Sequence, residues 1–205
     1  MNKAFPVLGF DIGGTKIAIC LAMSDGTVIA TGRVDNKMKT PDEVLPQAVA
    51  EGERILASAG ISKQELRAIG ISSPSPMDFD KGLICNPCNL NGWIDVPIRD
   101  YLGKAFETEA FFDNDANGAG LAEWFFGAGK GTQDMIYLTM STGIGGGIIA
   151  TMPSEGDLKS PEIGHYVDKY LRGVECVPTE DRIRVGRLIE NMTMGTAAVG
   201  YLPES

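Results

Sequence analysis

Residues 9–16 read Gly-Phe-Asp-Ile-Gly-Gly-Thr-Lys, and the interpretation of the chain starts from this stretch. The apolar run 7–10 leads into it, and the β-branched run 17–21 follows it. Two such runs on either side of Gly13 and Gly14 predict a β-hairpin. Glycine takes the positive φ of a tight turn without strain, and its missing Cβ lets backbone N–H groups approach a bulky anion. The stretch is therefore either an ordinary turn or a turn that binds phosphate.

A second glycine-rich stretch, Ser-Thr-Gly-Ile-Gly-Gly-Gly, occupies residues 141–147. It follows the apolar strand expected at 135–140 and precedes the apolar run 148–150, and the pair Asn114 and Asp115 lies between the two stretches. This arrangement resembles the paired phosphate loops of the sugar kinase, actin and Hsp70 superfamily. More closely, it resembles the ROK family of sugar kinases and sugar-responsive repressors.

The composition indicates a folded globular protein. The chain has 205 residues, of which 43% are hydrophobic, and this is enough for a substantial core. The formal net charge of -9 argues against a nucleic acid partner, because binding to phosphate backbones requires a basic face. No apolar run is long enough to span a bilayer and no signal peptide opens the chain, so we expect a cytoplasmic protein without membrane contact.

The four cysteines are spread unevenly along the chain, which indicates a reducing compartment rather than a disulfide framework. Cys85 and Cys88 have the Cys-x-x-Cys spacing of a redox motif or half of a zinc site. No second pair or histidine cluster completes that site. Ordinary loop thiols are the other interpretation, and the sequence does not decide whether this pair has a function.

The elements expected along the first part of the chain follow a recognisable order. A third strand at 28–31 completes an antiparallel meander, and a helix runs from the N-cap Thr40 to Gly60, with strand 68–71 after it. A short helix at 97–101, a strand at 110–112 and a helix at 118–126 continue the pattern. Three antiparallel strands followed by helical crossovers resemble the ribonuclease-H-like lobe of the actin and hexokinase superfamily, an α/β fold.

Residues 72–93 are rich in Pro, Ser, Asn and Gly, and a loop this long in a compact domain is usually either functional or disordered, of which we favour the first. Its last part, Asn-Leu-Asn-Gly-Trp at 89–93, resembles the ROK segment that lines the sugar pocket. The resemblance makes Asn89 a candidate for bonding a sugar hydroxyl. The alternative is a surface turn with Trp93 as a packing anchor. Ser75 stands where the family usually has glycine.

Asn114 and Asp115 lie where the strand at 110–112 leads into the helix expected at 118. An acidic residue there either caps the helix or takes part in chemistry at the end of the strand. In the ROK pattern Phe-x-Asn-Asp-Ala-Asn, Asn114 corresponds to the residue that orients the sugar. Asp115 corresponds to the general base.

The resemblance implies one candidate for each task of phosphoryl transfer to a sugar hydroxyl. Asp115 would accept the proton, and Asp11 would hold Mg²⁺ through water. The cradle for the ATP phosphates would consist of the N–H groups of Gly13, Gly14, Gly143 and Gly145, together with Thr15 and Thr142. Lys16 either adds a positive charge or is a surface residue of the second strand.

Residues 161–165, Pro-Glu-Ile-Gly-His, resemble the ROK signature Gly-Glu-Ile-Gly-His. In that family the glutamate binds the sugar, and the histidine touches the sugar and ligates a structural zinc. Glu162 and His165 are therefore candidate substrate ligands. A single histidine is otherwise a satisfied structural residue.

The resemblance weakens after about residue 167. Only Cys176 lies where the family has a cysteine-rich zinc segment, so we expect no structural zinc. We expect an N-terminal ribonuclease-H-like lobe at 1–117 and the start of an incomplete second lobe at 118–205. Residues 168–205 do not resemble the family, and a helix is expected within them at 183–194. Compared with the family, the chain resembles a truncated or divergent relative.

These observations lead to one function and one alternative. The first is the ATP-dependent phosphorylation of a hexose, glucokinase-like, with ATP and Mg²⁺ as cofactors. The alternative is a non-catalytic ROK remnant or a regulatory sugar-binding module. A ROK repressor is disfavoured, because no helix-turn-helix precedes the first strand. The family also implies a homodimer, and the identity of the sugar lies beyond the sequence.

Overall fold

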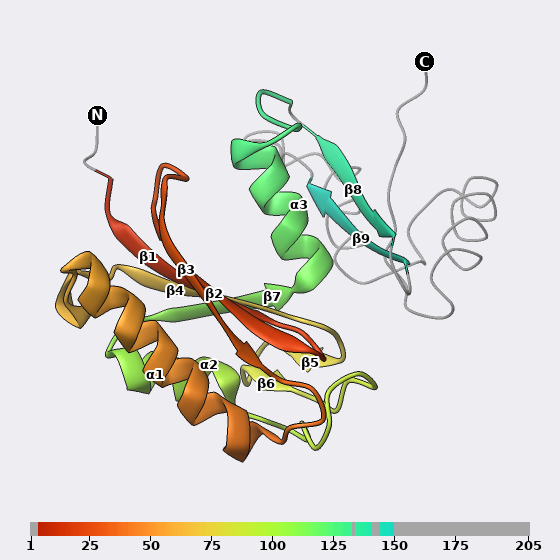
Figure 1. Ribbon diagram of the computed structural model, residues 1–205. Helices are drawn as coiled ribbons and strands as arrows, with labels where there is room; N and C mark the ends of the chain where they lie inside the picture. Colours follow the sequence, from red (N-terminus) through yellow and green to blue (C-terminus); the bar gives the residue numbers. More distant parts are fainter. Residues whose placement is uncertain (1–3, 133, 141–143, 150–205) are drawn as a thin grey trace. The chain divides into compact units, whose positions relative to one another are not determined.

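The computed structural model describes residues 4–132, 134–140 and 144–149, which are coloured in Figure 1. The chain divides after Asp115 into two compact units, and each unit is described by itself. Within the described ranges, no helix is both long and apolar enough to cross a membrane. The helix expected at 183–194 lies outside these ranges.

A five-stranded sheet forms the centre of the first unit (Figure 1). Its strands are β1 (Pro6–Ile12), β2 (Lys16–Met23), β3 (Val28–Asp35), β4 (Ala68–Ser73) and β7 (Ala110–Asn114). Their order across the sheet is β3-β2-β1-β4-β7. β1 to β3 pair antiparallel, whereas β4 pairs parallel with both β1 and β7. This order confirms the expected meander followed by crossovers.

Helix α1 (Pro41–Ala59) begins and ends with the capping residues that the sequence predicts. The Thr40 N–H donates to the Glu43 carboxylate at 2.8 Å, which closes the capping box, and proline occupies the first helical position. At the other end, Gly60 has φ 68° and its N–H donates to the Ala57 carbonyl oxygen at 3.1 Å. Glycine suits this left-handed position because it has no Cβ. Local sequence therefore determines both ends of α1.

Helix α2 (Ile98–Phe106) is longer than the short helix expected at 97–101. Its buried residues Ile98, Leu102 and Phe106 recur every four positions, which places them on one face of the helix. This face packs against β4 and β7, while α1 packs against β2 and β3. Figure 1 shows both helices on the same face of the sheet.

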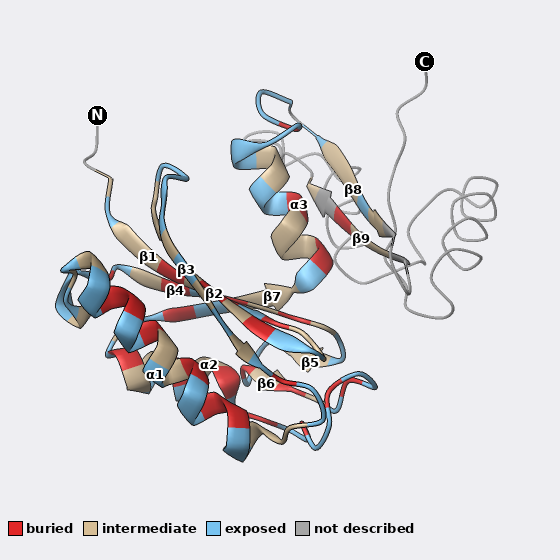
Figure 2. Cartoon of the chain, viewed as in Figure 1, coloured by how far each residue is buried: buried red, intermediate tan, exposed pale blue. Residues whose placement is uncertain are grey.

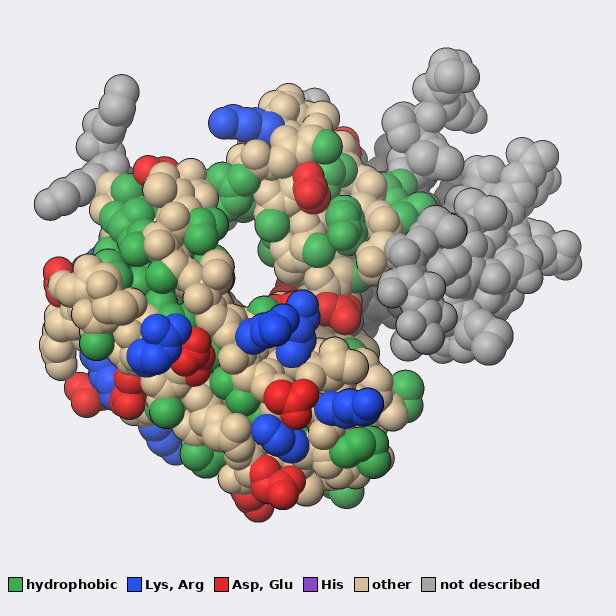
Figure 3. Space-filling model, viewed as in Figure 1, with side chains coloured by type: hydrophobic (Ala, Val, Ile, Leu, Met, Phe, Trp, Pro, Cys, Tyr) green, Lys and Arg blue, Asp and Glu red, His purple; other side chains and the backbone are tan. Residues whose placement is uncertain are grey.

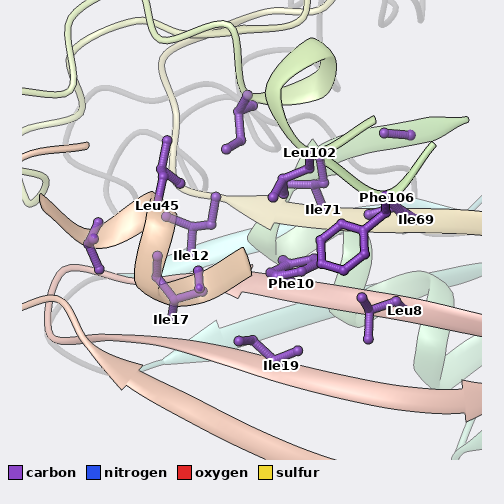
Figure 4. Packing of buried hydrophobic residues seen from close by; sticks show 14 of the residues in the cluster. Leu8, Phe10, Ile12, Ile17, Ile19, Leu45, Ile69, Ile71, Leu102 and Phe106 are labelled. Atoms are coloured by element: carbon purple, nitrogen blue, oxygen red, sulfur yellow. The ribbon is translucent and has the colours of Figure 1, made fainter. Parts of the chain in front are cut away.

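The core of the first unit lies between the sheet and these two helices. Alternate residues of each central strand point toward the helices, and the burial colours of Figure 2 follow this alternation. The rings of Phe10 and Phe106 meet with centroids 5.7 Å apart, and Figure 4 shows them side by side. The inward residues of the first two strands are Leu8, Phe10, Ile12, Ile17, Ile19 and Leu21.

The sequence analysis expected a long loop at 72–93, but the segment between β4 and α2 contains regular structure. It contains the short antiparallel pair β5 (Met77–Asp78) and β6 (Leu83–Ile84). Trp93 is fully buried, and its carbonyl oxygen accepts the N–H of Asn86 at 2.7 Å. The indole therefore anchors the end of the segment in the core, as the packing interpretation of Trp93 stated.

The surface of the first unit carries acidic and basic side chains that alternate in space. Figure 3 shows them interspersed over the region of α1 and α2. Two of the ion pairs are Arg54–Glu51 at 2.7 Å and Lys63–Glu53 at 2.6 Å. Exposed pairs of this kind contribute at most about 1 kcal/mol each. Stability therefore depends on the core rather than on these charges.

The second unit contains helix α3 (Asp115–Phe126) and a hairpin of β8 (Met135–Met140) and β9 (Ile144–Ile149). Helix α3 begins three residues before the position expected from the sequence, Gly118. β8 has the bounds that were expected. β9 begins within the stretch 141–147 that was expected to form a turn, so residues 144–147 are strand instead.

Candidate functional site

The predicted polar residues of the first unit meet at the carboxyl ends of its parallel strands. In the register of the sheet, Asp11 of β1 lies beside Ser72 of β4, and Ser72 lies beside Asp113 of β7. The Ser72 hydroxyl donates to Asp11 Oδ1 at 3.1 Å. Ligands of open α/β sheets bind at this edge, because loops from successive parallel strands converge there.

Asn114 and Asp115 continue the same strand end. Asn114 pairs with Ser73 in the sheet, and its Nδ2 donates to Ser75 Oγ at 3.0 Å. Asp115 is the next residue and the first residue of α3. Within the first unit, Asp115 directly follows the end of β7. The end of β7 pairs with β4, and β4 pairs with β1, which carries Asp11. Asp11 and Asp115 therefore lie at one edge of one sheet.

The turn that joins β1 to β2 lies at this edge too. The Gly13 N–H donates to the Lys16 carbonyl oxygen at 2.9 Å, which closes the turn and uses that donor. Among the described residues, none accepts a hydrogen bond from the N–H groups of Gly14 and Thr15. The Thr15 and Lys16 side chains are exposed. The donors left for an anion at this turn are thus Gly14, Thr15 and the two side chains.

The glycines of the turn do not adopt the positive φ that the sequence analysis expected. Neither Gly13 nor Gly14 lies in the left-handed region. Gly14 is instead required by close approach, since a Cβ there would overlap the Asn89 carbonyl oxygen. The missing Cβ is therefore needed at Gly14, although the sequence analysis linked it to the approach of an anion. The close neighbour is protein backbone.

The same contact places the predicted sugar-binding segment against the predicted phosphate turn. The backbone of Asn89 packs on Gly14. The neighbouring Leu90 is buried, and its N–H donates to the Pro87 carbonyl oxygen at 3.0 Å. Two segments that lie far apart in the sequence are thus in contact in the first unit.

The chemistry of Asp11 fits a hydrated magnesium ion. Its side chain is exposed, and the Ser72 hydroxyl engages only one of its two oxygens. Mg²⁺ in proteins usually keeps several waters and binds through one or two carboxylates together with substrate phosphates. Asp113, the carboxylate in the same row of the sheet, already accepts the N–H of Asn114 at 2.6 Å.

Sequence reasoning missed three residues of this edge. Ser72 bonds Asp11, Ser75 bonds Asn114, and Asn36 Nδ2 donates to the Gly13 carbonyl oxygen at 2.7 Å. Ser75 was noticed only as a departure from the usual glycine. Asn36 belongs to none of the quoted motifs. Asn36 directly follows β3, which pairs with β2, and this position was the one feature that could have indicated a contact with the β1–β2 turn.

The second glycine hairpin has a different arrangement from the first. Gly145 lies inside β9, opposite Thr139, rather than in a turn. A Cβ on Gly147 would come within 2.5 Å of the Ala116 carbonyl oxygen, so this glycine lets β9 pack against the first turn of α3. Thr142 and Gly143, the other two predicted phosphate ligands, lie outside the described residues.

Several further predictions also lie outside the described ranges. Glu162, His165 and Cys176 are among them, so the sugar contacts of the first two and the expected lack of a structural zinc stay predictions. Cys85 and Cys88 are free thiols. Burial raises the pKa of the Cys85 thiol, and Asp95 raises it further, which disfavours the reactive thiolate. This favours ordinary loop thiols.

A groove of about 590 Å³ lies elsewhere in the first unit, between α2 and the edge strand β7. Its lining includes Phe79, Arg99, Lys104 and Phe112. None of the predicted catalytic or binding residues contributes to it. The candidate residues of the first unit therefore lie outside this groove.

Comparison with known proteins identifies the class and the family. The sequence profile of the ROK family matches residues 7–178. The matched range extends beyond residue 167, after which the resemblance in the sequence motifs weakens. A fructokinase from Zymomonas mobilis is 33% identical over 199 residues, covering 90% of this chain and 61% of that protein.

Two solved structures agree with this match. A ROK hexokinase from Thermus thermophilus is 37% identical with a TM-score of 0.64, over 71% of this chain and 47% of the other. A ROK glucokinase from Streptomyces griseus, in complex with glucose and AMPPNP, is 31% identical with a TM-score of 0.58, over 71% of this chain and 44% of the other.

The fold is thus the α/β ribonuclease-H-like lobe of the actin and hexokinase superfamily. The chain belongs to the ROK family. It spans about half the length of the curated relatives that it matches.

Proposed function

We propose that this protein catalyses ATP-dependent phosphorylation of a hexose, with Asp115 as the general base. The observation that carries the proposal is the convergence at one sheet edge of Asp11, Asp115 and a turn in which two N–H groups have no acceptor among the described residues. Phosphoryl transfer needs a positioned hydroxyl, a proton acceptor and donors for the phosphate oxygens. This edge offers a candidate for each.

Asp115 is the group that would accept the proton of the sugar hydroxyl. It follows the strand end that carries Asn114, whose Nδ2 is held by Ser75 Oγ at 3.0 Å. The amide oxygen of an asparagine accepts hydrogen bonds, and a sugar hydroxyl is a donor of the kind that it accepts. The proposal therefore gives Asn114 the orienting role and Asp115 the base role.

The turn between β1 and β2 would bind the phosphates. The Gly14 and Thr15 N–H groups supply two donors, the Thr15 hydroxyl supplies a third, and Lys16 supplies a positive charge. Asp11 would hold Mg²⁺ through water, and the bound ion neutralises charge on the phosphates. Thr142, Gly143 and Gly145 of the second hairpin stay part of the proposed phosphate cradle.

The sugar contacts in the first unit come from a segment that the core holds in place. Asn89 lies directly on Gly14, so a sugar bound by Asn89 would lie near the phosphate turn. Glu162 and His165 complete the proposed sugar ligands. The kind of hexose is open to experiment, since relatives carry the names glucokinase, fructokinase and N-acetylmannosamine kinase.

Coupled-enzyme turnover with glucose, fructose, mannose and N-acetylmannosamine tests the proposal. At least one sugar should be phosphorylated with ATP and Mg²⁺. Asp115→Asn should lower kcat by about 10²–10⁴-fold, because it removes the proton acceptor while keeping the shape of the side chain. Asp80→Asn is the matched control: Asp80 is exposed, its backbone carbonyl oxygen accepts a hydrogen bond from Arg99 of α2 at 2.9 Å, and the variant should keep wild-type turnover.

Two results would contradict the proposal. Asp115→Asn with wild-type kcat would remove Asp115 from the base role. No turnover with any sugar, together with a sugar-dependent rise in melting temperature, would favour the non-catalytic sugar-binding module. Light scattering of the same sample tests the expected homodimer.

A further inference from the structure

Asn36 is a buried polar residue that contacts the proposed phosphate turn. It follows β3 and is 3% exposed. Its Nδ2 donates to the Gly13 carbonyl oxygen at 2.7 Å, and its backbone N–H donates to the Thr15 carbonyl oxygen at 3.0 Å. A single residue therefore holds two carbonyl groups of the turn.

These two bonds restrict where the free N–H groups of the turn point. A trans peptide is planar, and its C=O and N–H point in opposite directions. The Gly13 carbonyl and the Gly14 N–H share one such plane, so the bond to the buried Asn36 side chain directs the Gly14 N–H away from Asn36. The bond to Thr15 fixes the other end of the turn. The segment with both unpaired donors is thus held at each end.

The Asn36 side chain is explained by this bond rather than by its contribution to packing. Its Oδ1 atom is buried and has no hydrogen-bond partner in the described part of the chain. A buried acceptor without a partner lowers stability. A small apolar residue would avoid that loss but could not donate to Gly13. What the asparagine supplies is the donor.

The connection that contains Asn36 also binds the segment that presents Asn89. The Lys39 N–H donates to the Asn36 carbonyl oxygen at 3.3 Å. Two residues after Asn36, the Met38 carbonyl oxygen accepts a hydrogen bond from Asn91 Nδ2 at 2.9 Å. The phosphate turn and the sugar segment are therefore bonded to the same four residues, 36–39.

We infer that Asn36 is a positioning residue for the nucleotide: it orients the Gly14 N–H toward the phosphates by holding the Gly13 and Thr15 carbonyls. This inference rests on the proposed function and adds a residue that touches neither substrate. Its effect should appear in nucleotide affinity and leave the sugar contacts unchanged, since Asn91 bonds Met38 rather than the Asn36 side chain.

Steady-state kinetics of two variants tests the inference. Asn36→Ala removes the donor, and Asn36→Asp replaces it with an acceptor that faces the Gly13 carbonyl. Asn36→Ala should raise KM for ATP about tenfold, as the loss of one buried hydrogen bond would, with little change in KM for the sugar. Asn36→Asp should raise it further. Ile55→Val, a core substitution in α1, controls for loss of stability and should leave KM for ATP unchanged.

Hydrogen exchange measured by NMR tests the same inference without any turnover. In the unsubstituted protein the Asn36 amide should be protected and the Gly14 and Thr15 amides should exchange fast. Asn36→Ala should speed exchange of the Gly13 amide, which closes the turn. This readout also covers the case in which the variants fail to fold, because the first expectation concerns the unsubstituted chain.

The outcomes separate the inference from the proposed function. An unprotected Asn36 amide, or an Asn36→Ala protein with wild-type exchange and wild-type KM for ATP, overturns the inference while leaving a kinase intact. A wild-type protein that neither turns over nor binds AMPPNP overturns the proposed function, and with it the nucleotide role of Asn36. An equal rise in both KM values would indicate a general structural role and also overturns the inference.

Discussion

The two glycine hairpins share a sequence pattern and differ in what their glycines do. In the β1–β2 turn, the Gly14 N–H has no acceptor in the described part of the chain, and Gly14 makes room for the Asn89 carbonyl. In β9, Gly145 and Gly147 lie inside a strand and make room for the first turn of α3. A glycine pattern thus indicates where backbone comes close to something, but not whether the neighbour is a ligand or the protein itself.

Gly14→Ala is expected to have the largest effect. The new methyl would overlap the Asn89 carbonyl oxygen, so the turn and the sugar segment must separate. Overpacking of this kind costs about 1–3 kcal/mol of stability. A displacement of the order of 1 Å lowers turnover by about 10²-fold. Urea unfolding and coupled turnover measure the two effects, and a fully active variant would show that the contact is not needed.

Gly147→Ala should lower the stability of the protein and leave the β1–β2 turn unchanged. The added Cβ would lie 2.5 Å from the Ala116 carbonyl oxygen, and backbone yields less easily than a side chain. We expect a loss of about 1–3 kcal/mol. Hydrogen exchange should localise the loss to the second unit. If the Gly14 and Thr15 amides changed their exchange instead, the distinction between the hairpins would fail.

Gly70→Ala is the control for both substitutions and should have a small effect of opposite sign. Gly70 lies in β4, has no positive φ, and a Cβ there meets nothing within 4 Å. Replacing glycine in a strand by alanine stabilises by about 0.5–1 kcal/mol through the unfolded chain. A loss of stability equal to that of Gly14→Ala would mean that the close contacts do not explain the first two results.

Acid should lower the free energy of unfolding of the first unit through its two capping boxes. We expect this effect to be smaller than those of the glycine substitutions. The Thr40 N–H lowers the pKa of Glu43, and the Ser62 N–H lowers the pKa of Glu65, each from an ordinary value of 4.5. Each carboxylate therefore binds protons less readily when folded, so its contribution to stability is present above about pH 4.5 and is lost as the pH falls further. Both side chains are exposed, so screening keeps the effect small.

Urea unfolding at pH 7 and at pH 3.5 measures this loss. Glu43→Gln should be slightly less stable than wild type at pH 7, and this difference should be smaller at pH 3.5. Asp42→Asn, one position earlier in the same helix, changes the charge without breaking the box. An equal pH response in both variants would show that the helix dipole, rather than the capping bond, carries the effect.

The elements of the first unit were largely predictable because their signals are local. The helix caps at Thr40 and Gly60, the Gly13-Gly14 turn and the apolar alternation of β1 and β2 each need only a few neighbouring residues. The convergence of Asp11 with the end of β7 followed from strand order, which the family resemblance supplied. The register that places Asp11, Ser72 and Asp113 in one row was visible only in the fold.

The sequence alone determined the five strands of the sheet and helix α1, the family, and the candidate acids Asp11 and Asp115, since local steric preference and motif spacing depend on consecutive residues. Tertiary structure decided the rest. It showed that Gly14 makes room for Asn89, that the Gly13 donor is already used, and that Asn36 holds the turn. The contact of Gly14 with Asn89 and the bond of Asn36 to Gly13 join segments far apart in the sequence, and no local pattern encodes which backbone groups such segments will leave free.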